Sequence, residues 1–174
     1  GLEQDNDWPV YHQAMGATKY GSLNASNAFY TVTETWNDTE PTSTNFTVGS
    51  ASNVNLANKK YIAYLFAEDT ADVIKTGSFV GNGSSQNIDV GFNPQWVLWK
   101  VAEPLQGVAA AWGIQDTKRT GTLYSSLDST EYSGFSYLDF IEGGFTANSS
   151  SSSDPMMNGN GYTYIYVAIA APPP

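Results

Sequence analysis

Short apolar runs recur every 8 to 14 residues along the chain, and clusters of Gly, Asn, Ser, Asp and Pro separate them. No helical period persists over three turns, although a short helix remains possible at residues 65–74. This spacing predicts strands joined by polar turns, and therefore an all-β antiparallel sandwich of the lectin or jelly-roll kind. The expected strands are residues 8–12, 19–23, 29–35, 45–48, 61–67, 73–80, 87–90, 96–101, 109–115, 121–124, 134–141, 145–147 and 162–170.

Two of these runs, "YIAYLFA" at residues 61–67 and "YTYIYVAIA" at residues 162–170, are apolar on both alternating faces. A strand of this kind has to be covered on both faces, because neither face suits water. We therefore expect both runs to be central strands between layers, or strands at a subunit interface.

The two runs close two similar halves of the chain, which predicts an internal duplication. The same order of motifs surrounds each run, at offsets of 99 to 104 residues. We expect a first β repeat at residues 1–74 and a hairpin unit plus second repeat at residues 75–174, in one compact domain or two tightly packed ones. The matched positions are Trp8 and Trp112, Gly21 and Gly121, Phe46 and Phe145, and Tyr61 and Tyr164.

The second repeat is preceded by a hairpin unit, "KTGSFVGNGSSQNIDVGFNPQWVLWK", that the first repeat lacks. The strands missing from the first repeat are expected either upstream in a longer parent chain or in another chain. An uncovered sheet edge invites aggregation, so some segment should pair with it.

Charge and composition narrow the function classes. The formal net charge is −10, from 17 acidic residues against 7 Lys and Arg. That balance gives no electrostatic footprint for nucleic acid and no polybasic membrane patch. The chain has no cysteine, which excludes disulfides and cysteine-ligated zinc, and no apolar run approaches the ~18 residues of a membrane span.

Candidate catalytic and metal-binding residues are few. His12 is the only histidine, and no G-x-S-x-G elbow accompanies it. Neighbouring carboxylates leave glycoside hydrolysis open, and Glu68, Asp69 and Asp72 are weak calcium candidates because calcium prefers oxygen ligands. Solvated surface charge is the simpler interpretation of all these acids, so we expect no enzyme activity and no required cofactor.

Aromatic residues within polar loops are the best binding candidates. Trp36 is followed by Asn37 and Asp38, and Tyr132 and Tyr137 lie in "STEYSGFSY". A sugar ring can stack on such an aromatic face while neighbouring amides and carboxylates bond its hydroxyls. Core filling is the alternative for these residues, and it is the favoured interpretation for the tryptophans within predicted strands, Trp8, Trp96, Trp99 and Trp112.

The motifs as a set resemble a domain family of tail-fibre-like and other virion-surface proteins of marine tailed bacteriophages, including phages of cyanobacteria. The resemblance rests on "DWPVYHQAMGATKYGSLN", "WNDTEPTSTNFTVGS", "YIAYLFAED", the hairpin unit and "YTYIYVAIA", and covers nearly the whole chain. It implies a β-rich, lectin-like appendage module, often oligomeric, at the virion surface. It supplies no catalytic motif to carry over.

These observations together predict a non-enzymatic module for adhesion to host-surface glycan. Its expected partners are copies of itself, other virion proteins and the glycan. A capsid or tail decoration protein with a purely structural role, and a polysaccharide-degrading appendage enzyme, are the two alternatives.

Overall fold

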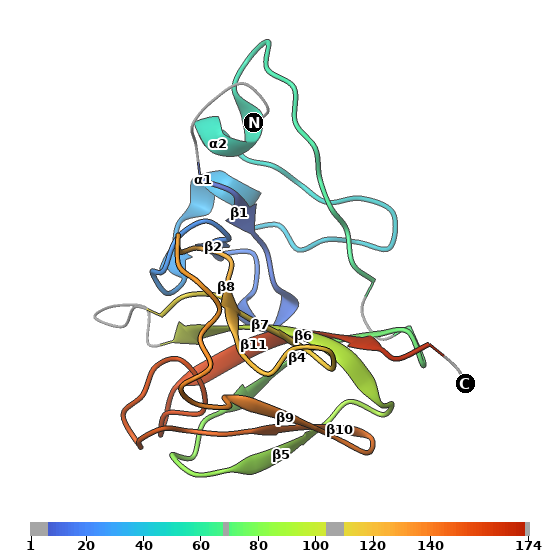
Figure 1. Cartoon of the computed structure of the whole chain (residues 1–174). Coiled ribbons are helices and arrows are strands. Elements are labelled where there is room, and N and C mark those ends of the chain that lie inside the picture. Colours follow the sequence, from blue (N-terminus) through green and yellow to red (C-terminus); the bar gives the residue numbers. More distant parts are fainter. Residues whose placement is uncertain (1–6, 68–69, 104–109, 173–174) are drawn as a thin grey trace.

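The centre of the molecule is a five-stranded antiparallel sheet with the order β4-β11-β6-β7-β8. The computed structural model describes residues 7–67, 70–103 and 110–172. Below the central sheet lies the three-stranded sheet β5-β10-β9, and above it lies an N-terminal lobe (residues 7–67) that contains the sheet β1-β2-β3 (Figure 1). The antiparallel pairing of every sheet confirms the all-β sandwich.

The described elements follow one another in chain order. They are β1 (Pro9–Val10), η1 (Gln13–Met15), β2 (Lys19–Ser22), β3 (Tyr30–Thr31), α1 (Thr33–Trp36), α2 (Ser52–Asn55), β4 (Ile74–Val80), β5 (Gln86–Asp89), β6 (Pro94–Glu103), β7 (Gly113–Asp116), β8 (Leu123–Tyr124), β9 (Leu138–Ile141), β10 (Gly144–Ala147) and β11 (Thr163–Ala170).

Both faces of the central sheet are covered, which explains why β11 is apolar on both faces. Trp99 and Tyr166 point down into a core that Leu138 and Phe145 of the lower sheet complete. Ile165 points up into a second core, where it meets residues of the N-terminal lobe that include Met15 and Phe29. Residues 162–170 are therefore confirmed as a central strand between layers.

The two predicted repeats share strand registers. In each repeat a short hairpin is followed by a third strand, and the second and third strands match at an offset of 102 residues. The Cα pair Val10–Gly21 of the first repeat corresponds to Ile114–Leu123 of the second. Likewise, Pro9–Ser22 corresponds to Gly113–Tyr124, and Tyr20–Tyr30 corresponds to Thr122–Tyr132. The structure thus matches Gly21 to Leu123 and not to Gly121, a shift of two residues that keeps each side chain on its face.

Residues 61–67 differ from the prediction of a central strand. The run forms no strand, and Tyr64 and Leu65 are 77% and 75% exposed. The physical reason is that β11 pairs with β4 on one edge and β6 on the other, whereas residues 61–67 have no such neighbours within the described part of the chain.

Several smaller predictions in the first repeat are also wrong. Residues 45–48 form no strand, and the predicted strand at 29–35 ends after Thr31 and continues as α1. Trp8 is 60% exposed and does not belong to the core, whereas Trp99 and Trp112 are buried as expected and Trp96 is half-buried. Short strands next to polar turns carry a weak pattern, so their ends and existence depend on their neighbours.

Lys100 of β6 is fully buried at the junction between the central sheet and the N-terminal lobe. Its Nζ donates hydrogen bonds to the carbonyl oxygens of Ser26, at 2.8 Å, and Ala110, at 2.5 Å. Burial lowers the pKa of Lys100 from 10.5 to about 8, because a low-dielectric environment disfavours the charged ammonium. Lys100 therefore joins the two halves at an electrostatic cost.

We predict that this cost appears as a pH dependence of stability. Between a folded pKa of about 8 and an unfolded pKa of 10.5, the unfolded chain binds the extra proton, so the free energy of unfolding rises with pH by up to ~1.4 kcal/mol per unit. Lys100→Met removes this contribution. Urea denaturation of both proteins from about pH 7.5 to about 9.5 should therefore show a steeper rise for the wild type; parallel profiles would contradict the assignment.

Candidate binding surface

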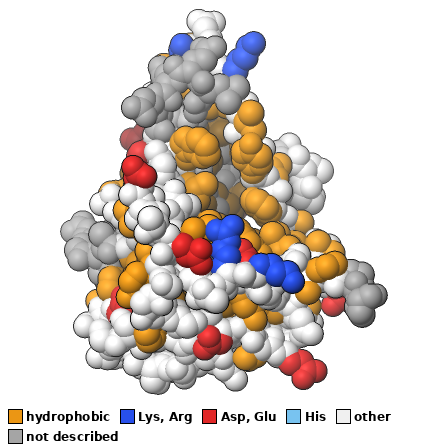
Figure 2. Space-filling model, viewed as in Figure 1, with side chains coloured by type: hydrophobic (Ala, Val, Ile, Leu, Met, Phe, Trp, Pro, Cys, Tyr) orange, Lys and Arg blue, Asp and Glu red, His pale blue; other side chains and the backbone are white. Residues whose placement is uncertain are grey.

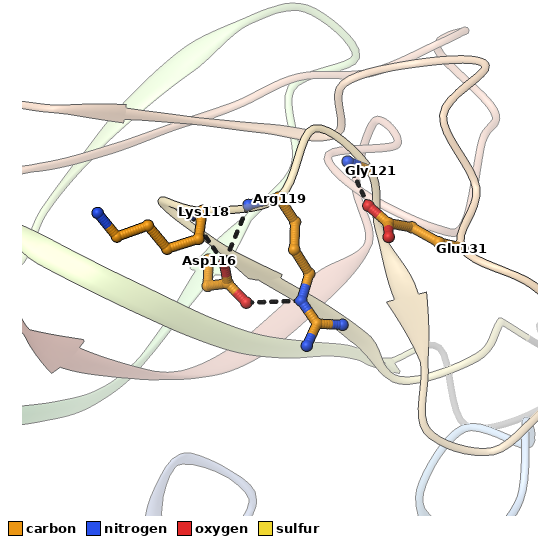
Figure 3. A network of polar contacts seen from close by, with 5 residues as sticks. All are labelled: Asp116, Lys118, Arg119, Gly121 and Glu131. Carbon is orange, nitrogen blue, oxygen red and sulfur yellow. Dashed lines mark hydrogen bonds and ion pairs between the residues drawn. The ribbon is translucent and has the colours of Figure 1, made fainter.

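The segment between β7 and β9 (residues 117–137) begins in a turn that Asp116 organises (Figure 3). One carboxylate oxygen of Asp116 accepts hydrogen bonds from the backbone N–H groups of Lys118, at 2.8 Å, and Arg119, at 3.1 Å. The other oxygen pairs with Arg119 Nε at 2.9 Å. A few residues later, the backbone N–H of Gly121 donates to Glu131 Oε1 at 2.9 Å, which holds the two limbs of the segment together.

This turn borders a shallow hollow of about 440 Å³. The half-buried Trp96 forms part of its wall, and Lys118 and Arg119 are exposed beside it. The positive charge at this hollow is partly compensated, because the Asp116 carboxylate that also lines it pairs with Arg119. The remaining lining residues are Gln95, Thr117 and Ile169.

Three tyrosines from the same segment gather further along the chain. The ring centroid of Tyr132 lies 6.3 Å from that of Tyr124 and 6.0 Å from that of Tyr137. Tyr132 is 40% exposed, whereas Tyr137 is buried and packs edge-on against Phe135. Tyr132 therefore has a ring face available to a ligand, and the buried ring of Tyr137 packs behind it.

Asp154 supplies a carboxylate to this cluster from the loop before β11. Burial raises the pKa of the Tyr137 hydroxyl, and the charge of Asp154, to which that hydroxyl is hydrogen-bonded, raises it further. Burial also raises the pKa of Tyr124, with smaller contributions from Tyr132 and Asp154. Asp154 is itself held in place, because it accepts hydrogen bonds from Ser150 Oγ and, at 2.8 Å, from the backbone N–H of Met156. We call Tyr124, Tyr132, Tyr137 and Asp154 the tyrosine cluster.

The residues predicted from the sequence fall into two separate groups. Tyr132 and Tyr137 belong to the tyrosine cluster. Trp36 is half-buried in the N-terminal lobe, where its Nε1 donates to the carbonyl oxygen of Lys19 at 3.1 Å. Asn37 and Asp38 follow it with φ angles of 53° and 46°, so they end α1 in the left-handed conformation that Asn and Asp tolerate. Within the described residues, no hydrogen bond or ring contact joins Trp36 to the tyrosine cluster.

The calcium candidates are only partly visible. Asp72 is exposed in the turn before β4, with a φ of 55°, and Glu68 and Asp69 lie outside the described residues. Among the residues that the structure describes, no group of three or more Asp, Glu, His or Cys side chains is arranged to hold a metal ion.

Sequence reasoning missed Tyr124 and Asp154. Tyr124 was assigned to a strand, and Asp154 lies in a serine-rich loop that reaches Tyr137 only through the fold. The sequence around Asp154, an isolated acid beside a proline, gives little indication of a binding role, because its tyrosine partners are 17 to 30 residues away in the chain.

Fold and surface together define an all-β protein of packed antiparallel sheets with an aromatic and acidic surface cluster. The chain belongs to the family described as Domain of unknown function (DUF7483), whose model matches residues 2–173. No curated protein and no solved structure matches the chain. No helix in the described ranges has the length and apolarity that crossing a membrane requires.

We predict that Asp154→Asn lowers the pKa of Tyr137 and, to a smaller extent, that of Tyr124. The neutral amide no longer opposes formation of a nearby tyrosinate, although the contribution of burial remains. Ultraviolet absorbance during an alkaline titration measures the change. Asp128→Asn, in an exposed position of the same segment, is the matched control; an equal effect of the two substitutions would show that Asp154 does not act on the cluster.

Proposed function

We propose that the chain is a non-enzymatic module of the virion surface of a tailed bacteriophage, and that it binds host-surface glycan through the tyrosine cluster. The virion location rests on the resemblance of its motifs to tail-fibre-like proteins. The glycan ligand rests on the chemistry of the cluster.

The observation that carries this proposal is the exposed ring of Tyr132. It packs against Tyr137, whose hydroxyl is hydrogen-bonded to the Asp154 carboxylate. A sugar ring presents C–H groups on its face and hydroxyls at its rim, so an aromatic face and a carboxylate acceptor suit it together. Single contacts of this kind are weak. Several copies on one particle would raise the overall avidity by about 10²- to 10⁴-fold.

A structural role in assembly is the second candidate function, and a different observation favours it. Ile62, Tyr64, Leu65 and Phe66 expose apolar side chains along one continuous run. Figure 2 shows hydrophobic side chains along the N-terminal lobe, over the region where this run descends in Figure 1. Exposed apolar surface of this kind marks interaction sites in proteins.

We predict that Tyr132→Ala weakens binding to polysaccharide extracted from the surface of marine cyanobacteria about tenfold, a loss of about 1.4 kcal/mol. The substitution removes the one exposed ring face of the cluster. Calorimetry of the purified chain with the extract measures the change.

Tyr30→Ala is the matched control for this experiment. Tyr30 occupies the equivalent third-strand position of the first repeat, and it is 39% exposed against 40% for Tyr132. If both variants bind as the wild type does, the cluster is not the glycan site.

Release of reducing sugar from the extract would instead favour the polysaccharide-degrading alternative. Immunogold labelling of intact particles separates an appendage from a capsid decoration.

A further inference from the structure

Residues 61–67 form an extended run without regular structure, although their sequence is typical of a central strand. Its first residue is anchored: the Tyr61 hydroxyl donates to the carbonyl oxygen of Ser52 and accepts from the backbone N–H of Leu56, both at 2.8 Å. Beyond it, Ile62 and Phe66 are 59% and 61% exposed. Within the described residues, no backbone hydrogen bond is made by residues 62–66.

The counterpart of this run in the second repeat shows what it lacks. In β11, Tyr164 and Ile165 are almost completely buried. Seven residues of β11 pair with β4 and eight pair with β6. The same apolar pattern is therefore stable in a fold when a strand lies on each edge and a layer covers each face.

The first three strands of the first repeat fold as their counterparts do. β1, β2 and β3 reproduce the registers of β7, β8 and the bridge to Tyr132. The backbone N–H of Leu23 donates to the Trp8 carbonyl oxygen as that of Ser125 donates to the Trp112 carbonyl oxygen. The repeats diverge after β3, where the described residues of the first repeat include no counterparts of β9 and β10, and again at residues 61–67, whose neighbours would be equivalents of β4 and β6.

We propose that residues 61–67 are an acceptor strand for a strand pair of the β4 and β6 type, carried by another repeat of the same family. The occupant is two strands with alternating apolar residues, one on each edge of the run and each antiparallel to it, as β4 and β6 lie against β11. This proposal goes beyond glycan binding and stands independently of the tyrosine cluster.

A second copy of this chain is a poor donor, because its own β4 and β6 already flank its β11. Donation would break that pairing for no net gain. Simple pairing of residues 61–67 with the open edge of β4 in a second copy would leave the other edge of the run free, so it does not reproduce the environment of β11.

The test supplies the missing strands. A second copy of residues 70–103, which contains β4, β5 and β6, is joined to the N-terminus of the full chain by a flexible Gly/Ser linker. We expect hydrogen exchange of the backbone amides of residues 62–66 to slow about tenfold or more, because strand pairing protects them. The melting temperature should also rise.

Two matched variants make the result specific. Leu98→Pro is introduced in the added copy alone. It removes a backbone N–H donor from the added β6 strand, so hydrogen exchange at residues 62–66 should be slowed less. Tyr64→Asp in the run itself should prevent docking in the extended protein. In the unextended chain it should leave the melting temperature nearly unchanged, because Tyr64 is 77% exposed.

Three outcomes would overturn the proposal. The first is protection of residues 62–66 in the unextended chain that grows with protein concentration, because the run then pairs with a second copy. The second is protection at all concentrations without the extension. The third is an extended protein that folds, with its other amides protected as before, while exchange at residues 62–66 is unchanged. If the extended protein does not fold, a synthetic peptide of residues 70–103 added to the full chain gives the same readout.

Discussion

The fold depends on one constraint, the burial of β11 on both faces and both edges. Its two edges are filled by β4 and β6, which are brought to it from the other end of the second repeat. Its two faces require two covering layers, because Tyr166 points into the lower core and Ile165 into the upper one. The lower sheet and the N-terminal lobe can each be understood as a cover for this strand.

The duplicated halves consequently have different roles. The first repeat lies over the second, and polar contacts fix its position: Trp112 Nε1 donates to the Ser22 carbonyl oxygen at 2.8 Å, and Lys100 Nζ donates to that of Ser26. Buried polar groups of this kind stabilise a fold only when they are fully bonded, and they also specify one arrangement of the layers. A similar sequence in two places therefore does not require a similar environment.

The candidate surface brings together residues that lie far apart in the sequence. Tyr132 and Tyr137 were candidates from the sequence because they lie in a Gly- and Ser-rich loop, and the fold leaves Tyr132 partly exposed but buries Tyr137. Asp154 was not identifiable, because its role comes from the loop that precedes β11 and from the hydrogen bond to Tyr137. Trp36, the other aromatic candidate, is half-buried in the N-terminal lobe, where its Nε1 donates to the Lys19 carbonyl oxygen.

The sequence by itself determined the class of fold and the central position of residues 162–170, because alternation and apolar runs are local properties of the chain. Only the tertiary structure decided that residues 61–67 stay exposed. Two runs with nearly the same pattern differ in outcome because a strand is stabilised by its neighbours, and local sequence does not state whether those neighbours are present. The same reason explains Trp8 and Trp112, which share a motif but differ in burial.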